Sequence, residues 1–361
     1  QHINFIRNHF KFNKKKNSLI MKKIFLISTG GTGGHVVPAI ILSDHLREKC
    51  KVIISTDKRG LRYLDEDINK IEIVNTPKLN NIFLLPFNFF GLFLLTIKAF
   101  LVIKKYKIDE VISTGGYMSL PLIFASKLLN LNIYLVEPNH VLGRSNRYFL
   151  NSCKKIFCYN NEIKNFPEKF KNKIETIFPL VRKKIYNLQS ISQTKNKFTI
   201  LIVGGSQSAN IFNGHLKNVI VNLSKNFQIK IIHQTNETNI DNLKDFYTRN
   251  NLENEIFSFK DNFFEIIKQV DLSITRAGAS TLAELSLLHI PFIAVPLPSS
   301  KDNHQLENAK FYKNYNCCWV LEQKLFDEKI EEQLYEILDK KSDYLKKKEN
   351  LKKLNYKNTW K

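Results

Sequence analysis

The sequence predicts an α/β protein made of two Rossmann-like domains, each with a parallel sheet facing a central cleft. Short apolar runs rich in Ile, Val, Leu and Phe alternate with helical stretches along the chain. Such runs are typical of strands that are buried on both faces, as in a parallel sheet covered by helices. The alternation breaks into a polar stretch at 178–194 and then restarts, and both halves begin with a strand and a Gly-rich turn. The repeated start predicts two similar domains, with ligands bound between them at the carboxyl ends of the strands.

Each apolar run is expected to form one strand. The first half contains runs at 23–29, 52–56, 71–75, 111–114 and 133–137. The second half contains runs at 198–203, 229–233, 256–259, 272–275, 292–295 and 319–321. A chain of 361 residues is long for one hydrophobic core and sufficient for two. We therefore expect four parts, which are a disordered extension at 1–20, an N-terminal domain at 21–180, a C-terminal domain at 181–345 and a basic tail at 346–361.

Composition narrows the classes of function. The formal net charge of +22 suits an anionic partner such as nucleic acid, acidic lipid or a phosphorylated substrate, although a general bias toward Lys and Asn accounts for part of it. The basic residues are spread along the chain and no nucleic-acid-binding motif is present, which argues against a nucleic-acid partner. The cysteines are odd in number and form no Cys-x-x-Cys pair, so we expect reduced thiols and no metal site at Cys50, Cys153, Cys158, Cys317 and Cys318.

Two segments bear on the location of the protein. Residues 1–20 lack the unbroken apolar run of a signal peptide, so we expect the protein to stay in the cytoplasm. The apolar segment 82–103 is interrupted by Pro86, Asn88 and Lys98, and further lysines follow it. This pattern favours a helix that lies in the plane of an anionic membrane surface over a buried core helix or a membrane span.

The strongest local motif is Thr-Gly-Gly-Thr-Gly-Gly-His at 29–35. Its glycines allow a ligand to approach the backbone, and the helix that follows offers unpaired N–H groups to an anion. Val36 replaces the third glycine of a dinucleotide-binding fingerprint, while Asp57 ends the second strand as that fingerprint requires. The motif therefore matches a dinucleotide-binding fingerprint only in part, and a dinucleotide site stays an alternative. His35 is either a catalytic base for a hydroxyl or a histidine that packs the loop.

Two further polar loops follow strands of the same sheet, so we expect them on the same rim as His35. The first contains Ser-Thr-Gly-Gly-Tyr at 113–117, and the second contains Val-Glu-Pro-Asn-His at 136–140. Glu137 is either a second carboxylate in the site or a capping acid. Asn139 either holds a sugar hydroxyl or caps the next helix.

The second half repeats the strand, glycine and helix arrangement at 203–208, where Ser206 is placed to contact a phosphate or to cap the helix. At 276–284 the motif Arg-Ala-Gly-Ala-Ser-Thr-Leu-Ala-Glu begins another helix, and Glu284 is able to accept hydrogen bonds from ribose hydroxyls or to face solvent. The polar loop at 296–305 can bind a neutral sugar through its amides.

Together these motifs resemble the MurG family, glycosyltransferase family 28, over about 23–319. The matched stretches are GGTGGHVVP, TGGYMSLP, EPNHVLGRSNR, VGGSQSAN, RAGASTLAE and KDNHQLENA. The resemblance implies a GT-B fold and inverting transfer of N-acetylglucosamine from UDP-GlcNAc to the 4-hydroxyl of MurNAc in a lipid-linked precursor, forming lipid II for peptidoglycan synthesis. It implies no cofactor and no essential metal. It also implies action at the cytoplasmic face of the inner membrane as a peripheral protein, with other cell-wall synthesis proteins as further candidate partners.

The resemblance also implies roles for individual residues. The donor diphosphate or the acceptor phosphate would lie against Thr32, Gly33 and Gly34. Asn139 would contact the sugar and Arg182 the donor. In the second half a donor phosphate would contact Ser206, and Gln305 would bind N-acetylglucosamine hydroxyls. The main chain of Lys260 would contact uracil. Phosphate and ribose would be held by Ala279, Ser280, Thr281, Leu282, Ala283 and Glu284.

The chain departs from the family pattern at a few positions. Pro138 replaces a glutamine, and Ile-Phe-Pro-Leu at 177–180 replaces the usual Gly-Asn-Pro, which affects the placement of Arg182 most. Ser208 replaces a glycine and His304 replaces the first of two glutamines. His35 is the preferred general base and Glu137 the alternative. Other functions to be weighed are a sister UDP-sugar enzyme, such as a lipid glycosyltransferase or an epimerase, and a nicotinamide-dependent oxidoreductase.

Overall fold

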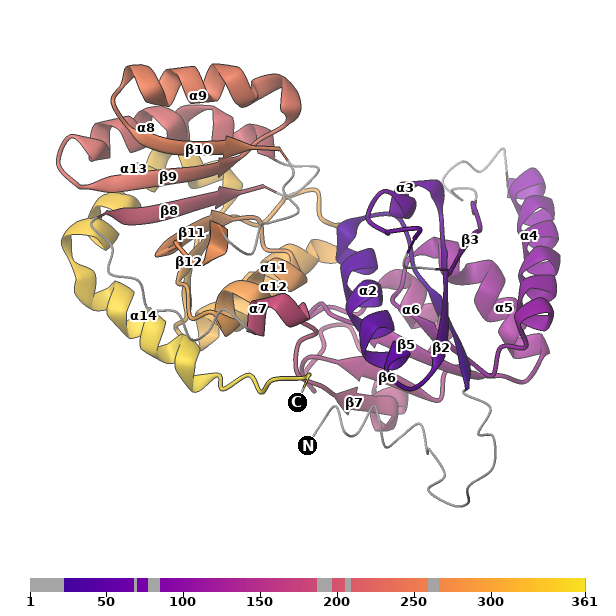
Figure 1. Cartoon of the computed structure of the whole chain (residues 1–361). Coiled ribbons are helices and arrows are strands. Elements are labelled where there is room, and N and C mark those ends of the chain that lie inside the picture. The colour runs from indigo at the N-terminus through magenta and orange to yellow at the C-terminus, as the bar shows by residue number, and fades with distance from the viewer. Residues whose placement is uncertain are drawn as a thin grey trace. The chain divides into compact units, whose positions relative to one another are not determined.

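The computed structural model describes residues 23–67, 70–76, 85–186, 197–204, 209–258 and 266–360. These residues form two compact α/β units (Figure 1). The first unit contains the described residues up to Val181 together with Asn358–Trp360, and the second contains Arg182–Lys357. The prediction of two α/β domains, each with a parallel sheet, is confirmed.

The first unit is built on a seven-stranded parallel sheet with the order β3-β2-β1-β4-β5-β6-β7. Its strands are β1 (Ile24–Ser28), β2 (Lys51–Thr56), β3 (Lys70–Ile73), β4 (Glu110–Ser113), β5 (Asn132–Glu137), β6 (Lys155–Cys158) and β7 (Ile174–Thr176). The sequence analysis missed the last two. Strand β6 has the sequence Lys-Ile-Phe-Cys and β7 has Ile-Glu-Thr, so the polar residues in them leave no apolar run that stands out from the loops beside them.

Alternate residues of the central strand β1 enter two different cores, which explains why the whole strand is apolar. Phe25 and Ile27 pack in the core that contains Val36 and Ala39 of α2 (Gly33–Arg47). Leu26 packs in a separate core on the opposite face, with α4 (Leu85–Tyr106) and α5 (Leu120–Leu128). The described residues of this unit also form the α-helices α3 (Lys58–Leu61) and α6 (Arg144–Phe149).

Helix α4 buries one face and exposes the other. Ala99, Val102 and Ile103 are buried, whereas the apolar side chains of Phe90, Phe93, Leu94, Ile97 and Leu101 are exposed. Among the residues that the structure describes, no helix is long and apolar enough to cross a membrane.

The second unit has a six-stranded parallel sheet with the order β10-β9-β8-β11-β12-β13. Its strands are β8 (Phe198–Val203), β9 (Ile229–Gln234), β10 (Glu253–Phe257), β11 (Leu272–Thr275), β12 (Phe292–Ala294) and β13 (Cys318–Val320). Its α-helices are α7 (Lys183–Tyr186), α8 (His215–Ser224), α9 (Ile240–Arg249), α11 (Ala279–Leu287), α12 (His304–Asn314), α13 (Phe326–Asp339) and α14 (Lys341–Lys353). In both sheets the strand order reverses beside the first strand, between β1 and β4 and between β8 and β11. The loops that leave these strands diverge, which is where open α/β sheets bind ligands.

The end of the chain returns to the first unit. The Trp360 ring stacks on His45 of α2 with 3.5 Å between ring centroids, and its Nε1 donates to the Val181 carbonyl at 3.0 Å. Residues 346–357 belong to the second unit and 358–360 to the first. This division differs from the single basic tail expected at 346–361. All five cysteines are buried free thiols, as expected.

Candidate active site

The loop after β1 carries the predicted glycine motif and needs its glycines for two reasons. Gly31 has a φ of 80°, a backbone conformation that other residues rarely adopt. A Cβ at Gly30 would lie 2.8 Å from Asp57 Oδ1, closer than such contacts allow. The loop then enters α2 through Thr32, Gly33 and Gly34. The N–H groups of Gly33 and Gly34 are the first two of the helix and have no acceptor within it, whereas that of His35 donates to the Thr32 carbonyl.

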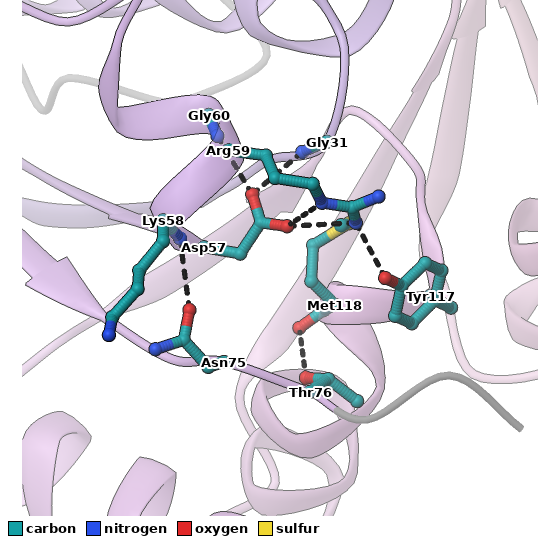
Figure 2. A network of polar contacts seen from close by, with 9 residues as sticks. All are labelled: Gly31, Asp57, Lys58, Arg59, Gly60, Asn75, Thr76, Tyr117 and Met118. Carbon is teal, nitrogen blue, oxygen red and sulfur yellow. Dashed lines mark hydrogen bonds and ion pairs between the residues drawn. The ribbon is translucent and has the colours of Figure 1, made fainter.

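Asp57 organises this loop from the end of β2 (Figure 2). Its Oδ1 accepts hydrogen bonds from the backbone N–H groups of Gly31 at 2.8 Å and Gly60 at 2.9 Å, and its Oδ2 accepts from Arg59 Nε at 2.9 Å. Burial opposes its ionisation, but these donors outweigh burial and lower the pKa of Asp57. Both oxygens of the Asp57 carboxylate already accept hydrogen bonds within the protein. This argues against the ribose contact that a dinucleotide fingerprint requires.

His35 lies in the first turn of α2 against the loop after β4. Its Nδ1 lies 2.8 Å from the Thr114 carbonyl, so Nδ1 carries the proton in this bond. In the neutral imidazole the lone pair is then on Nε2, as a base requires. Gly115, with a φ of 94°, packs on the ring, and a Cβ there would lie 3.2 Å from His35 Cε1. The two glycine loops therefore meet at the imidazole, as the sequence predicted.

The third predicted loop follows β5 and is held by Glu137, whose side chain is buried. The carboxylate accepts from Asn139 Nδ2 at 3.0 Å, Gly143 N at 2.8 Å and Asn146 Nδ2 at 3.0 Å. Burial raises the pKa of Glu137 against the opposing effect of these bonds. Ser145 connects this region to the second loop because its Oγ accepts from the Gly116 N–H at 2.9 Å. Gly143, Ser145 and Asn146 lie within the sequence motif at 137–147, but their residue types alone do not predict these contacts.

The second unit holds a two-bond ion pair between Arg182 and Glu284, which lies within α11. Arg182 Nε donates to Glu284 Oε1 at 2.6 Å and Arg182 Nη2 to Oε2 at 2.7 Å. Burial disfavours the charged guanidinium, but the Glu284 carboxylate outweighs it and raises the pKa of Arg182. The sequence predicted that Arg182 and Glu284 lie at one site, and in the structure the two side chains contact each other directly.

The motif before Glu284 divides into two kinds of residue. Leu282 and Ala283 are buried in the core, so only their backbone can reach a ligand. Ala279, Ser280 and Thr281 are half-buried at the first turn of α11, which Gly278 caps. Among the described residues, the buried Ser280 Oγ has no hydrogen-bond partner.

Two side chains connect the loops beside α11. Gln305 Oε1 accepts from the backbone N–H groups of Ala277 at 3.2 Å and Leu297 at 3.0 Å. Arg276, for which the sequence alone predicts no role, donates to the Val295 carbonyl at 3.1 Å and to Gln323 Oε1 at 2.7 Å. Burial lowers the pKa of Arg276 to about 10.

The predicted residues thus fall into two groups. The first unit brings together the segment from Thr32 to His35 with Glu137 and Asn139, and the second brings together Arg182, the start of α11 and Gln305. Ser206 and Lys260 lie outside the described residues. Within the described parts of the chain, no group of three or more His, Cys, Asp or Glu side chains could hold a metal ion.

Comparison with known proteins covers both units. The glycosyltransferase family 28 N-terminal domain matches residues 25–158, and the family's C-terminal domain matches residues 199–359. A relative from Pelagibacter ubique is 47% identical over 342 residues, which cover 94% of this chain and 96% of the relative. It is named UDP-N-acetylglucosamine–N-acetylmuramyl-(pentapeptide) pyrophosphoryl-undecaprenol N-acetylglucosamine transferase. A relative of the same name from Rickettsia canadensis is 37% identical over 84% of this chain and 86% of its own length.

Solved structures agree on the fold. The crystal structure of Acinetobacter baumannii MurG superposes with a TM-score of 0.72 at 24% identity, covering 92% of this chain and 95% of that protein. The S. aureus MnaA–UDP structure gives a TM-score of 0.64 at 12% identity, covering 94% of this chain and 93% of that one. These likenesses concern the fold alone, whereas the sequence matches extend over both units. The chain therefore belongs to glycosyltransferase family 28.

Proposed function

We propose that this protein transfers N-acetylglucosamine from UDP-GlcNAc to the 4-hydroxyl of MurNAc in undecaprenyl-diphosphate-MurNAc-pentapeptide, forming the lipid-linked disaccharide used in peptidoglycan synthesis. The observation that carries the proposal is the 47% identity, across 94% of the chain, to a relative named for this reaction. The two family domains match residues 25–158 and 199–359.

The acceptor hydroxyl must lose a proton as it attacks the anomeric carbon, and we assign the base to His35. The Nδ1–H bond to the Thr114 carbonyl supports this role because it orients the ring and leaves the lone pair on Nε2. A positioned base contributes a factor of about 10²–10⁴ to the rate.

Glu137 is better suited to positioning than to proton transfer. Its carboxylate is buried and already accepts hydrogen bonds from three residues. One of them is Asn139, whose amide nitrogen it holds at 3.0 Å. In this proposal Glu137 fixes Asn139, and Asn139 contacts the sugar.

The donor would bind in the second unit. The first N–H groups of α11 receive no hydrogen bond from a capping side chain, and the Ser280 hydroxyl has no partner among the described residues, so both suit the leaving diphosphate. Arg182, held by Glu284, supplies positive charge, and Glu284 retains lone pairs for ribose hydroxyls. Gln305 uses its oxygen within the protein, which leaves its amide N–H groups for the hydroxyls of N-acetylglucosamine. Ser206 and Lys260 remain proposed contacts to phosphate and uracil.

The lipid acceptor requires a membrane surface, and α4 with α5 supplies a suitable face. The exposed apolar side chains of Phe93, Leu101 and Leu128 lie among the exposed lysines Lys98 and Lys104. An apolar face edged by lysines suits a helix pair resting on anionic lipid. We therefore place the protein at the cytoplasmic face of the inner membrane as a peripheral protein, where other cell-wall synthesis proteins are candidate partners.

The alternatives are less well supported. A nicotinamide site would need an acidic residue for the ribose, and Asp57 is occupied by Gly31, Gly60 and Arg59. A UDP-N-acetylglucosamine 2-epimerase shares the fold, but only at 12% identity.

The test is transfer of labelled N-acetylglucosamine from UDP-GlcNAc to purified undecaprenyl-diphosphate-MurNAc-pentapeptide in the presence of EDTA. We expect a labelled lipid product. UDP binding without product would point to a sister UDP-sugar enzyme, and absence of both would overturn the proposal.

A further inference from the structure

We propose that Arg59 is a substrate-binding residue that holds the diphosphate of the lipid-linked acceptor at the rim of the first unit. This inference rests on the proposed function and adds a residue that the motifs do not contain. Arg59 lies on α3, a single short helix between β2 and β3, outside every glycine motif of the chain.

The guanidinium is fixed on one side and open on the other. Nε donates to Asp57 Oδ2 at 2.9 Å, and Nη2 lies 2.9 Å from the same oxygen and 2.5 Å from the Tyr117 hydroxyl. In Figure 2 the third nitrogen, Nη1, points away from both partners, and among the described residues it has none. Arg59 therefore presents an N–H donor that Asp57 and Tyr117 hold in a defined direction, which suits a phosphate oxygen.

The side of the Asp57–Arg59 ion pair that faces solvent is positive. The Asp57 side chain is only 8% exposed and its oxygens are occupied by four N–H contacts, whereas the Arg59 side chain is 46% exposed. The negative charge therefore lies behind the loop and the positive charge faces solvent. A ligand that approaches the rim meets the guanidinium first.

Arg59 also lies directly beside the glycine loop. A Cβ at Gly31 would lie 3.8 Å from Arg59 Nη2 and 3.3 Å from Met118 Cε, so the guanidinium lies within van der Waals reach of the loop. The Gly31 N–H is used by Asp57, and the next N–H groups along the chain are those that begin α2. The guanidinium and the start of α2 can therefore contact one anion together.

Tyr117 connects this anion site to the proposed base. Its hydroxyl accepts from Arg59 and keeps its own proton for a further bond. Tyr117 follows the two glycines of the loop that packs on His35. The 4-hydroxyl and the diphosphate of the acceptor are attached to opposite ends of one sugar ring, so a base and a phosphate site on one rim match that substrate.

The position of the site favours the lipid-linked diphosphate over the nucleotide. The residues proposed for UDP-GlcNAc lie in the second unit, whereas Arg59 is in the first. Lys98 of α4 donates to the Ile73 carbonyl at the end of β3 at 2.9 Å, and the exposed apolar side chains of Ile97 and Leu101 lie next to Lys98 on the same helix. A diphosphate whose lipid tail stays in the membrane would therefore reach this rim.

The experiment compares Arg59→Gln with Lys58→Gln in the transfer assay. Lys58 is the neighbouring exposed cation of α3, and its side chain points away from the network in Figure 2. We expect R59Q to raise the apparent KM for the lipid acceptor by about tenfold to one-hundredfold, the range of a lost hydrogen bond to a charged group, with little change in the KM for UDP-GlcNAc. K58Q should leave both KM values near those of the wild type.

A second measurement separates ligand binding from a structural role. Inorganic pyrophosphate should inhibit the wild type competitively with the acceptor and lose potency against R59Q at a temperature where circular dichroism shows both proteins folded. An unchanged acceptor KM, a rise confined to the KM for UDP-GlcNAc, or equal pyrophosphate inhibition of both proteins would overturn the assignment of Arg59. A wild type that transfers no N-acetylglucosamine would instead overturn the proposed function.

Discussion

Arg182 and Glu284, which are 102 positions apart in the chain, form a two-bond ion pair with N–O distances of 2.6 and 2.7 Å. The pair connects the first residue of the second unit to the helix whose start is proposed to bind the donor diphosphate. A planar guanidinium matches a carboxylate in this geometry, and a lysine could not reproduce it. The pair therefore fixes the direction of Arg182 before any donor arrives.

Glu284→Gln should weaken UDP binding and lower the melting temperature. Gln can accept only one of the two bonds from Arg182, which leaves a partly buried charge less well compensated, and we expect a loss of about 1–3 kcal/mol in binding free energy. Calorimetric titration with UDP measures the effect. Glu322→Gln, which removes a surface pair with Lys324, is the control and should change little. Equal UDP affinity in E284Q and the wild type would exclude this role.

His35→Gln should lower kcat by about 10²–10⁴ while UDP still binds. The amide can replace the bond to the Thr114 carbonyl, so the loop geometry is retained while the base is lost. Steady-state kinetics at saturating acceptor, together with UDP titration, separates the two effects. Wild-type turnover in this variant would remove His35 from proton transfer.

Asp57→Asn should destabilise the first unit at neutral pH and have a smaller effect in acid. The folded pKa of Asp57 lies below its ordinary value of 3.8, so its contribution to stability is present above that value and is lost as pH falls through the folded pKa. The apparent melting temperatures of variant and wild type should therefore converge below about pH 4. A gap that stays constant from neutral pH into acid would contradict this reasoning.

Phe93→Glu should reduce binding to anionic vesicles. The Phe93 side chain is 60% exposed on α4, and a charge there removes apolar area and opposes the lipid charge. Sedimentation with vesicles containing phosphatidylglycerol is the measurement. Leu345→Glu, at a side chain 54% exposed on α14 of the second unit, is the matched control. Equal losses in both variants would argue against a specific docking face.

The sequence predicted most of the fold because a strand buried on both faces is apolar throughout. Phe25, Leu26 and Ile27 show why, since successive residues enter different cores. It also predicted that the loops containing His35, Gly115 and Asn139 meet, because the carboxyl ends of parallel strands share one edge.

Other features could not be predicted because they depend on distant contacts. Nothing in the sequence around Glu284 predicts its ion pair with Arg182. Asp57 has the position of a ribose-binding acid, and only the geometry of α3 turns it toward Gly31 and Arg59. Strand β7, with three residues, is defined by its pairing with β6 rather than by its own pattern.

The return of the chain to the first unit affects the order in which the protein folds. The second unit is inserted between two segments of the first, so residues 358–360 are synthesised after the whole of the second unit. Trp360 can contact His45 and Val181 only from that point on. The sheet of the first unit can form early during translation, but its packing is completed only after the second unit has been made. Loss of residues 358–360 would therefore act on the first unit, although these residues follow the second.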